Sequence, residues 1–329
     1  MKNVVIYDDF KEYEVRPPQL LKEYVGLLES EVGQFFPAKD NIVLKECPAC
    51  GCREENRSFV RFKMFVYHEC RECLTVYVSP RPSQQNLERF YAESRAAKFW
   101  EENMLAKTEE ARAEHLFAKR AQWIEDICLG RQNKKLALLD VTPALRSKRE
   151  QFKQLGVLTK FADRDIGDFC KGYEGETFEA VTAFDVIGSL SSPLSLITSA
   201  HKALGPGGML FLSMTASTGF DIQVLWDRAA RIFPPDHLNL FSPEGIEKCL
   251  NRQGFELIEL STPGQLDVDI VRNVIENEPD LKISPFLKYL LQKREEESRQ
   301  ELQEFLQRFK LSSYMRVVAQ KRKDNESAI

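Results

Sequence analysis

Residues 135–156 read KLALLDVTPALRSKREQFKQLG, which places a strand, a loop and a helix in the order typical of a parallel α/β sheet. The apolar run Leu136–Val141 is interrupted only by Asp140, and this pattern predicts a strand buried on both faces. A helix-forming segment follows and ends at Gly156, a residue suited to the left-handed turn after a helix. This stretch therefore predicts an α/β fold.

The loop between that strand and that helix lacks glycine. In nucleotide-binding sheets of this kind, loop glycines let the backbone approach the ligand and point N–H groups at its charged part. Here the loop reads TPALR over residues 142–146, and its proline donates no N–H. The signal for the fold is intact, whereas the signal for ligand binding is damaged.

Strands and helices alternate from residue 134 onward, which predicts a mainly parallel sheet. Six strands are expected: Leu136–Val141, Thr159–Ala162, Ala180–Phe184, Met209–Met214, Leu257–Leu260 and Tyr314–Ala319. Helices are expected between them, notably Pro193–Leu204 and Pro243–Gln253. A single helix with apolar ends and a polar middle is expected over Pro285–Phe309, as a lid, a dimer contact or a surface decoration.

The rest of the chain divides around this α/β domain. Residues 1–82 are expected to form an N-terminal segment, with a helix over Pro18–Phe35, and a small β-rich module. Residues 83–133 predict a helical linker, and residues 134–329 the α/β domain, with its helical insertion at about residues 265–312.

Composition and charge restrict the class of protein. The chain has 329 residues, 43% hydrophobic and 29% charged, enough to bury a sizeable core. Its net charge of −4 gives no general attraction for nucleic acid or acidic membranes. No apolar run approaches the roughly 18 residues of a membrane span. The apolar run near the N-terminus is too short for a secretion signal. We expect a cytoplasmic protein with reduced cysteines and no nucleic-acid or membrane partner.

Four of the eight cysteines form two C-x-x-C pairs, whose spacing is typical of a four-cysteine zinc site: Cys47, Cys50, Cys70 and Cys73. Each pair can form a tight turn in which two thiolates converge, and two such turns complete a tetrahedron without an open position. We therefore predict a structural zinc ion. The alternative is a set of buried thiols without an ion. Cys52 and His68 lie nearby in the sequence and are expected to be bystanders.

The order of the four-cysteine module, the helical linker and four motifs resembles class I S-adenosylmethionine-dependent methyltransferases. The motifs are LLDV, FEAVTAFDVIGSL, ALGPGGMLFLSM and PPDHLNLFSPEGIEKCLNRQGFELIEL. The chain is most similar to the subgroup with an N-terminal zinc-binding module, often found among enzymes that modify sugars and other small metabolites. The resemblance covers roughly residues 45–265 and is most specific over residues 178–255. It implies a Rossmann-like sheet, S-adenosylmethionine as cofactor and a small, carbohydrate-like acceptor.

The cofactor loop departs from the family pattern, which is an acid after the first strand followed by a glycine-rich loop. Asp140 matches the acid, whereas Thr142, Ala144 and Arg146 stand at the glycine positions. By the resemblance, the backbones of these last three residues would lie against the methionine part of the cofactor, and Asp140, Thr142 and Ala144 are the candidate cofactor-binding residues of this loop. A Cβ atom or an arginine side chain would intrude there.

The segment between Gly156 and Phe178 is too short for a second strand, a helix and a third strand, which need at least about 30 residues. One strand–helix unit is therefore expected to be missing or reduced. In the family that unit carries the acid that holds the ribose hydroxyls, a role that Asp163 or Asp165 would take here. Asp168 stands in a Gly-Asp-Phe segment that resembles the adenine-contacting turn. The alternative is that these acids are ordinary loop carboxylates.

A Glu-His pair that the subgroup usually carries after the fourth strand is replaced by Gly188 and Ser189. His237 matches the family and is the candidate general base; alternatively it fixes its loop through hydrogen bonds. Tyr67 and Tyr91 are expected to be packing residues. Two functions are open: an active methyltransferase on a small carbohydrate-like acceptor, or a pseudoenzyme that acts as a binding or partner subunit. The three departures favour the second.

Overall fold

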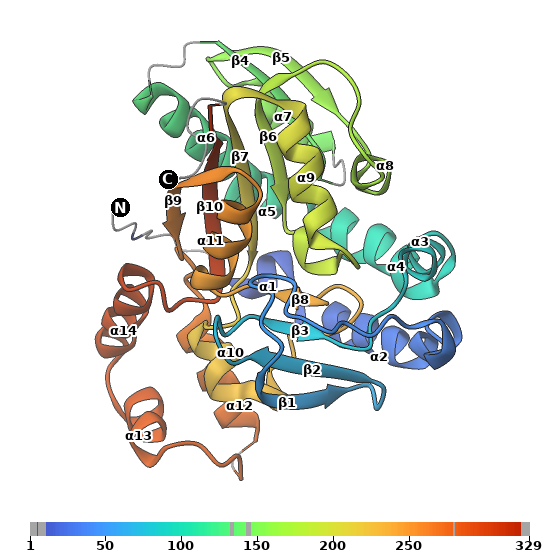
Figure 1. Cartoon of the computed structure of the whole chain (residues 1–329). Coiled ribbons are helices and arrows are strands. Elements are labelled where there is room, and N and C mark those ends of the chain that lie inside the picture. Colours follow the sequence, from blue (N-terminus) through green and yellow to red (C-terminus); the bar gives the residue numbers. More distant parts are fainter. Residues whose placement is uncertain (1–4, 6–10, 132–134, 143–145, 279, 324–329) are drawn as a thin grey trace.

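The computed structural model describes residues 5, 11–131, 135–142, 146–278 and 280–323, and for residues 146 and 147 the backbone only. Two sheets organise this part of the chain, a six-stranded sheet in the upper half of Figure 1 and a four-stranded sheet below it. The larger sheet has the order β5-β4-β6-β7-β10-β9. Its strands are β4 (Leu136–Asp140), β5 (Leu158–Asp163), β6 (Phe178–Phe184), β7 (Leu204–Thr215), β9 (Phe255–Ser261) and β10 (Tyr314–Lys321). All six correspond to predicted strands.

The larger sheet is mainly parallel, as predicted. β5, β4, β6 and β7 pair in parallel, and β10 runs antiparallel to both of its neighbours, β7 and β9. Between β5 and β6, where every residue is described, the chain forms the short helix α8 (Ile166–Cys170) and no strand. The expected reduction by one strand–helix unit is therefore confirmed, and it leaves β5 at the edge of the sheet.

Helices cover both faces of this sheet because successive side chains of a strand point to opposite faces. Leu210 and Leu212 of β7 pack in the cluster with α9 (Pro193–Ala203) and α11 (Pro243–Arg252). Phe211, between them, packs with α6 (Lys119–Gly130) and α7 (Arg146–Lys153) on the other face. Each such buried side chain contributes about 2 kcal/mol.

The linker is helical, as predicted, and ends with α6 at Gly130. Its earlier helices are α3 (Gln84–Glu93), α4 (Arg95–Phe99) and α5 (Glu109–Arg112), with π-helical stretches at Trp100–Leu105 and Ala113–Ala118. Ser83 and Ser94 cap α3 and α4, since each hydroxyl accepts a hydrogen bond from a backbone N–H of the first turn. The chain therefore starts a new helix directly where α3 ends.

The four-stranded sheet joins the N-terminal module to the α/β domain. Its order is β1-β2-β3-β8, with β1 (Glu55–Arg61), β2 (Phe65–Cys70) and β3 (Val76–Val78) from the N-terminal part. The fourth strand, β8 (Asn239–Leu240), comes from the α/β domain and pairs antiparallel with β3. This pairing was not predicted, because its two strands are far apart in the chain. Helices α1 (Glu12–Val15) and α2 (Pro18–Phe35) precede the module, and α2 has the predicted bounds.

The C-terminal insertion contains three helices, α12 (Asp267–Asn277), α13 (Pro285–Lys293) and α14 (Glu296–Arg308). The prediction of one helix over residues 285–309 is wrong, because the backbone is extended at Arg294 and Glu295. Leu291 and Leu306, one on each side of the break, are both buried in the cluster that holds α12. A change of direction in the polar middle lets both apolar ends reach this core. In the described part of the chain, no helix is long and apolar enough to cross a bilayer.

Candidate functional site

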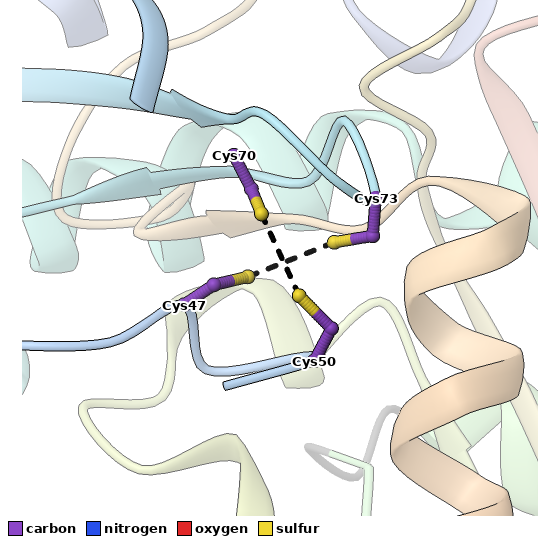
Figure 2. Close-up of side chains that lie close together, drawn as sticks. All are labelled: Cys47, Cys50, Cys70 and Cys73. Atoms are coloured by element: carbon purple, nitrogen blue, oxygen red, sulfur yellow. Dashed lines mark hydrogen bonds between the residues drawn. The ribbon is translucent and has the colours of Figure 1, made fainter. Parts of the chain in front are cut away.

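The two C-x-x-C pairs come together in one cluster. Figure 2 shows one pair on the segment before β1 and the other at the end of β2, with all four sulfurs converging. The four Sγ atoms lie within 4.8 Å of one another, with 3.7 Å between Cys47 and Cys73 and 3.5 Å between Cys50 and Cys70. A tetrahedral zinc ion with Zn–S bonds of about 2.3 Å requires sulfurs about 3.8 Å apart. The donor set and its spacing fit zinc.

Local backbone geometry forms each turn. Gly51 and Leu74 follow the two pairs with φ of 81° and 59°, and their N–H groups donate to the carbonyls of Cys47 and Cys70 at 2.9 and 3.0 Å. In each pair, this residue with positive φ closes the turn, so that both thiols of the pair lie on the same side of the turn. The hydrogen bond between Cys47 and Cys73 lowers the pKa of Cys73 and raises that of Cys47, so Cys47 holds the proton of the pair. One thiolate, the form that binds metal, is therefore stabilised in this pair.

The two expected bystanders lie outside this cluster. Cys52 accepts a hydrogen bond from Glu54 N, with 3.3 Å between sulfur and nitrogen. The His68 ring nitrogens lie 2.6 Å from Glu55 Oε2 and 2.9 Å from Ser79 O. The histidine therefore joins two strands of the module and is not directed at the cysteines.

The cysteine cluster packs directly against α11. Ser242, the N-cap of this helix, donates a hydrogen bond from Oγ to the carbonyl of Cys73, and its Oγ also accepts from Gly245 N at 2.8 Å. A Cβ atom on Gly245 would lie 2.0 Å from Thr75 Oγ1. Only glycine permits this close approach, so the start of α11 is fitted to the four-cysteine module.

The carboxyl end of β4 is occupied by a buried ion pair. Asp140 is fully buried, and its Oδ2 lies 2.6 Å from Nζ of Lys148, whose side chain is 1% exposed. Oδ1 of Asp140 accepts from Thr182 Oγ1 at 2.8 Å and from Thr142 N at 3.2 Å. Lys148 Nζ also donates to Thr142 O at 3.1 Å, and Thr142 Oγ1 accepts from Phe184 N at 2.9 Å. The polar groups of Asp140 and Thr142 are thus occupied by other residues of the chain.

Ala144, the third residue expected at the cofactor loop, lies outside the described residues. Lys148 was not singled out from the sequence. Helix α7 reads RSKREQFK, and its charge pattern carries no signal as to which cation turns inward. Burial lowers the pKa of Lys148, while Asp140 acts to raise it.

A second ion pair stands at the end of the neighbouring strand β6. Arg120 of α6 is 5% exposed and forms a short hydrogen bond with Asp185 Oδ2. Ser213 Oγ donates to the other oxygen of this carboxylate at 2.7 Å, and Arg120 also donates to Tyr314 OH at 3.4 Å. Both acids at the carboxyl ends of β4 and β6 are therefore paired with cations of the chain.

The acids expected on the adenosine side are also paired. Asp163 ends β5 directly beside Asp140 in the sheet register, which is the place expected for the ribose acid, and it forms an ion pair with Arg149. Asp168 is exposed on α8 and bonds to Lys171 at 3.1 Å. Asp165 caps α8, since its carboxylate accepts from Asp168 N at 3.1 Å. The roles proposed for Asp163 and Asp168 stay predictions.

His237 lies in the loop before β8 and lines a cavity of about 10 Å³, room for a single water molecule. The cavity is bounded by Arg16, Thr215, Asp221, Ile222, Arg231, Ile232 and His237. The ring donates from Nδ1 to Phe233 O at 3.3 Å. Burial and the nearby Arg16 lower the pKa of His237 to about 4, so the ring is neutral at pH 7. Its role as a general base stays a prediction.

Two tyrosines hold the same loop through Asp236. Tyr24 OH donates to Asp236 Oδ2 at 2.6 Å and Tyr91 OH to Oδ1 at 3.0 Å. Tyr67 OH donates to the carbonyl of His237 at 2.8 Å. The expectation that Tyr67 and Tyr91 only pack is therefore incomplete, since their hydroxyls fix the loop. Local sequence carries no signal for these contacts, because the partners are far apart in the chain.

These features define the fold of class I S-adenosylmethionine-dependent methyltransferases: the mixed sheet, helices on both faces and acids at the carboxyl ends of its strands. A family model described as a methyltransferase domain matches residues 93–260, half of the chain. The chain belongs to this family, and S-adenosylmethionine is the cofactor that the family implies. No curated protein matches the chain.

Solved methyltransferase structures are similar to this chain at low sequence identity. The plantazolicin methyltransferase BpumL, in complex with S-adenosylhomocysteine, is 13% identical over 73% of this chain and 95% of its own, with a TM-score of 0.44. The 1,6-didemethyltoxoflavin-N1-methyltransferase of Burkholderia thailandensis is 9% identical over 82% and 100%, with a TM-score of 0.43. A methyltransferase of Mesorhizobium loti is 13% identical over 61% and 98%, with a TM-score of 0.35.

Proposed function

We propose that this chain is a catalytically inactive member of the methyltransferase family. It would be a pseudoenzyme, related to enzymes that methylate sugars or other small metabolites, that acts as a binding module or partner subunit. The observation that carries the proposal is the buried pair of Asp140 and Lys148 at the end of β4. Function depends on the site and not on the fold, so this departure outweighs the family likeness.

The residues at this edge do not fit S-adenosylmethionine. The methionine part of this cofactor carries an ammonium and a sulfonium group, which need acceptors and room near the first strand. Asp140 is already ion-paired with Lys148, the carbonyl of Thr142 accepts a hydrogen bond from the same lysine, and Asp185 is paired with Arg120. Methyl transfer depends on holding two reactants in position. A cofactor site that Lys148 already occupies does not allow this.

The test is titration calorimetry of the full chain with S-adenosylmethionine and S-adenosylhomocysteine, backed by thermal shift. We expect no heat of binding and no stabilisation at millimolar ligand. Micromolar binding of either ligand would overturn the proposal. It would favour the second function, an active methyltransferase on a small carbohydrate-like acceptor, for which the neutral His237 ring at the cavity is the supporting observation.

We further propose that the four-cysteine cluster binds a structural zinc ion. Four thiols that fit a tetrahedron leave no coordination position open for a substrate, which supports a structural role. The proposal includes a reducing, cytoplasmic location, because closely spaced thiols form disulfides in oxidising compartments. Elemental analysis of the purified chain should find about one zinc ion per chain. A chain that is fully folded and free of metal would contradict the proposal.

A further inference from the structure

The carboxyl end of β4 has the chemistry of a site for a primary ammonium group. Two oxygen acceptors, Asp140 Oδ2 and Thr142 O, lie 2.6 and 3.1 Å from the Lys148 nitrogen. One of them carries the negative charge that balances the ammonium. Thr182 Oγ1 and Thr142 N hold the other carboxylate oxygen and fix its direction. The acceptors are therefore oriented by their own hydrogen bonds.

We propose that this end of β4 is an ammonium-binding site that the chain fills from within, with Lys148 in the place of a ligand's ammonium group. The inference deepens the proposed function and rests on it. The class of ligand is a primary ammonium ion on an alkyl chain. The four-carbon stem of Lys148 supplies that chain and belongs to one of the largest fully buried side chains in the described part of the protein.

Charge balance explains why the site does not accept a second cation. The Lys148 ammonium neutralises the Asp140 carboxylate, so another ammonium would leave a buried positive charge without a partner. Arg120 and Arg149 already act against the charged form of Lys148. A free ammonium ion can therefore enter only where the lysine side chain is absent.

The experiment removes the side chain and supplies its missing part as a free ion. Lys148→Ala leaves a cavity beside Asp140 that corresponds to propylammonium, which carries the three carbons and the nitrogen that alanine lacks. The thermal midpoint of this variant is measured in propylammonium chloride, in sodium chloride of equal ionic strength, and with the neutral 1-propanol. Lys153→Ala is the matched control, because Lys153 is an exposed residue of the same helix.

We expect propylammonium at about 100 mM to raise the midpoint of Lys148→Ala by roughly 3 °C, as for a ligand with a dissociation constant of about 10 mM. The wild type and Lys153→Ala should shift by less than about 1 °C. Equal shifts in all three chains, or an equal shift with 1-propanol, would overturn the inference. If Lys148→Ala does not fold alone, recovery of the folded chain on refolding in propylammonium replaces the midpoint, and failure to recover counts against the site.

A double variant separates charge from cavity filling. Asp140→Asn combined with Lys148→Ala keeps the cavity but removes the carboxylate, so propylammonium should have no effect on it. A response equal to that of Lys148→Ala would show non-specific filling and overturn the inference. The calorimetric test of the wild type is independent of this one. If propylammonium does not stabilise Lys148→Ala and the wild type does not bind the cofactor, only the ammonium site is overturned. If the wild type binds the cofactor, the proposed function is overturned.

Discussion

Tyr77 in β3 is paired with Asn239 in β8, so the sheet of the four-cysteine module is completed by a strand of the α/β domain. The loop that carries His237 leads directly into that strand and is held by Tyr24, Tyr67 and Tyr91. On the other side of the loop, Leu238 N donates to Gly188 O at 2.8 Å. The four-cysteine module and the loop that carries His237 are thus joined by a shared sheet and by hydrogen bonds.

This connection predicts that metal loss affects the α/β domain. Removing metal with a chelator, or by Cys73→Ser, should increase hydrogen exchange at β8 and in the first turn of α11. The reason is that the cysteine turn anchors both β3 and Ser242. β6 and β7 should keep their protection, because their contacts lie in the centre of the larger sheet. Cys52→Ser is the control and should keep its metal. Unchanged exchange at β8 in metal-free protein would show that the two parts are independent.

The two tyrosines on Asp236 should differ in their effect on stability. Tyr24 is 2% exposed and Tyr91 is 43% exposed, so water can replace only the second hydroxyl. Tyr24→Phe should lower the free energy of unfolding by about 2 kcal/mol, since a partly buried carboxylate loses a buried donor, and Tyr91→Phe by less than about 0.5 kcal/mol. Urea unfolding measures both. Equal losses of unfolding free energy in the two variants would mean that the burial of the hydroxyl does not determine its contribution.

The pair of Arg120 and Asp185 should respond asymmetrically to substitution. The Arg120 side chain is 6% exposed, whereas that of Asp185 is 51% exposed. Asp185→Asn leaves a buried guanidinium without its counter-charge and should cost about 3 kcal/mol of unfolding free energy. Arg120→Met removes the buried charge and leaves a solvated carboxylate, so its cost should be about 1 kcal/mol or less. Denaturant midpoints at neutral pH decide the order, and the reverse order would contradict the structure.

His237 gives stability a pH dependence with a defined sign. Its pKa is about 4 in the folded chain against 6.5 when unperturbed, so between these values the unfolded chain binds more protons. The contribution is therefore present above pH 6.5 and lost as the pH falls toward 4, by up to about 3 kcal/mol. Asp221, whose pKa burial raises to about 6, acts in the opposite direction over much of this range.

The difference between wild type and His237→Gln isolates the histidine, because Asp221 is common to both chains. The wild type should lose more stability than the variant between pH 6.5 and 4. Unfolding free energies measured across this range give the difference curve. A flat curve would mean that the ring is solvated and titrates normally.

Sequence pattern was a reliable guide wherever structure follows from neighbours along the chain. The alternation of apolar runs predicted all six strands of the larger sheet, and the bounds of α2 were predicted without error. The two C-x-x-C pairs predicted a four-sulfur cluster because each turn is local. The length between Gly156 and Phe178 predicted the missing strand–helix unit for the same reason, since a chain cannot form elements that it is too short to contain.

Tertiary structure alone decided which side chains meet across the fold. The sequence determined an α/β methyltransferase fold with a cysteine cluster and a loop without glycines. It did not determine that β8 would join the module, that the insertion would break at Arg294, or that Lys148 would turn inward to Asp140. Each of these depends on contacts between residues brought together by folding, and on burial, which strengthens a charge pair that solvent would otherwise screen.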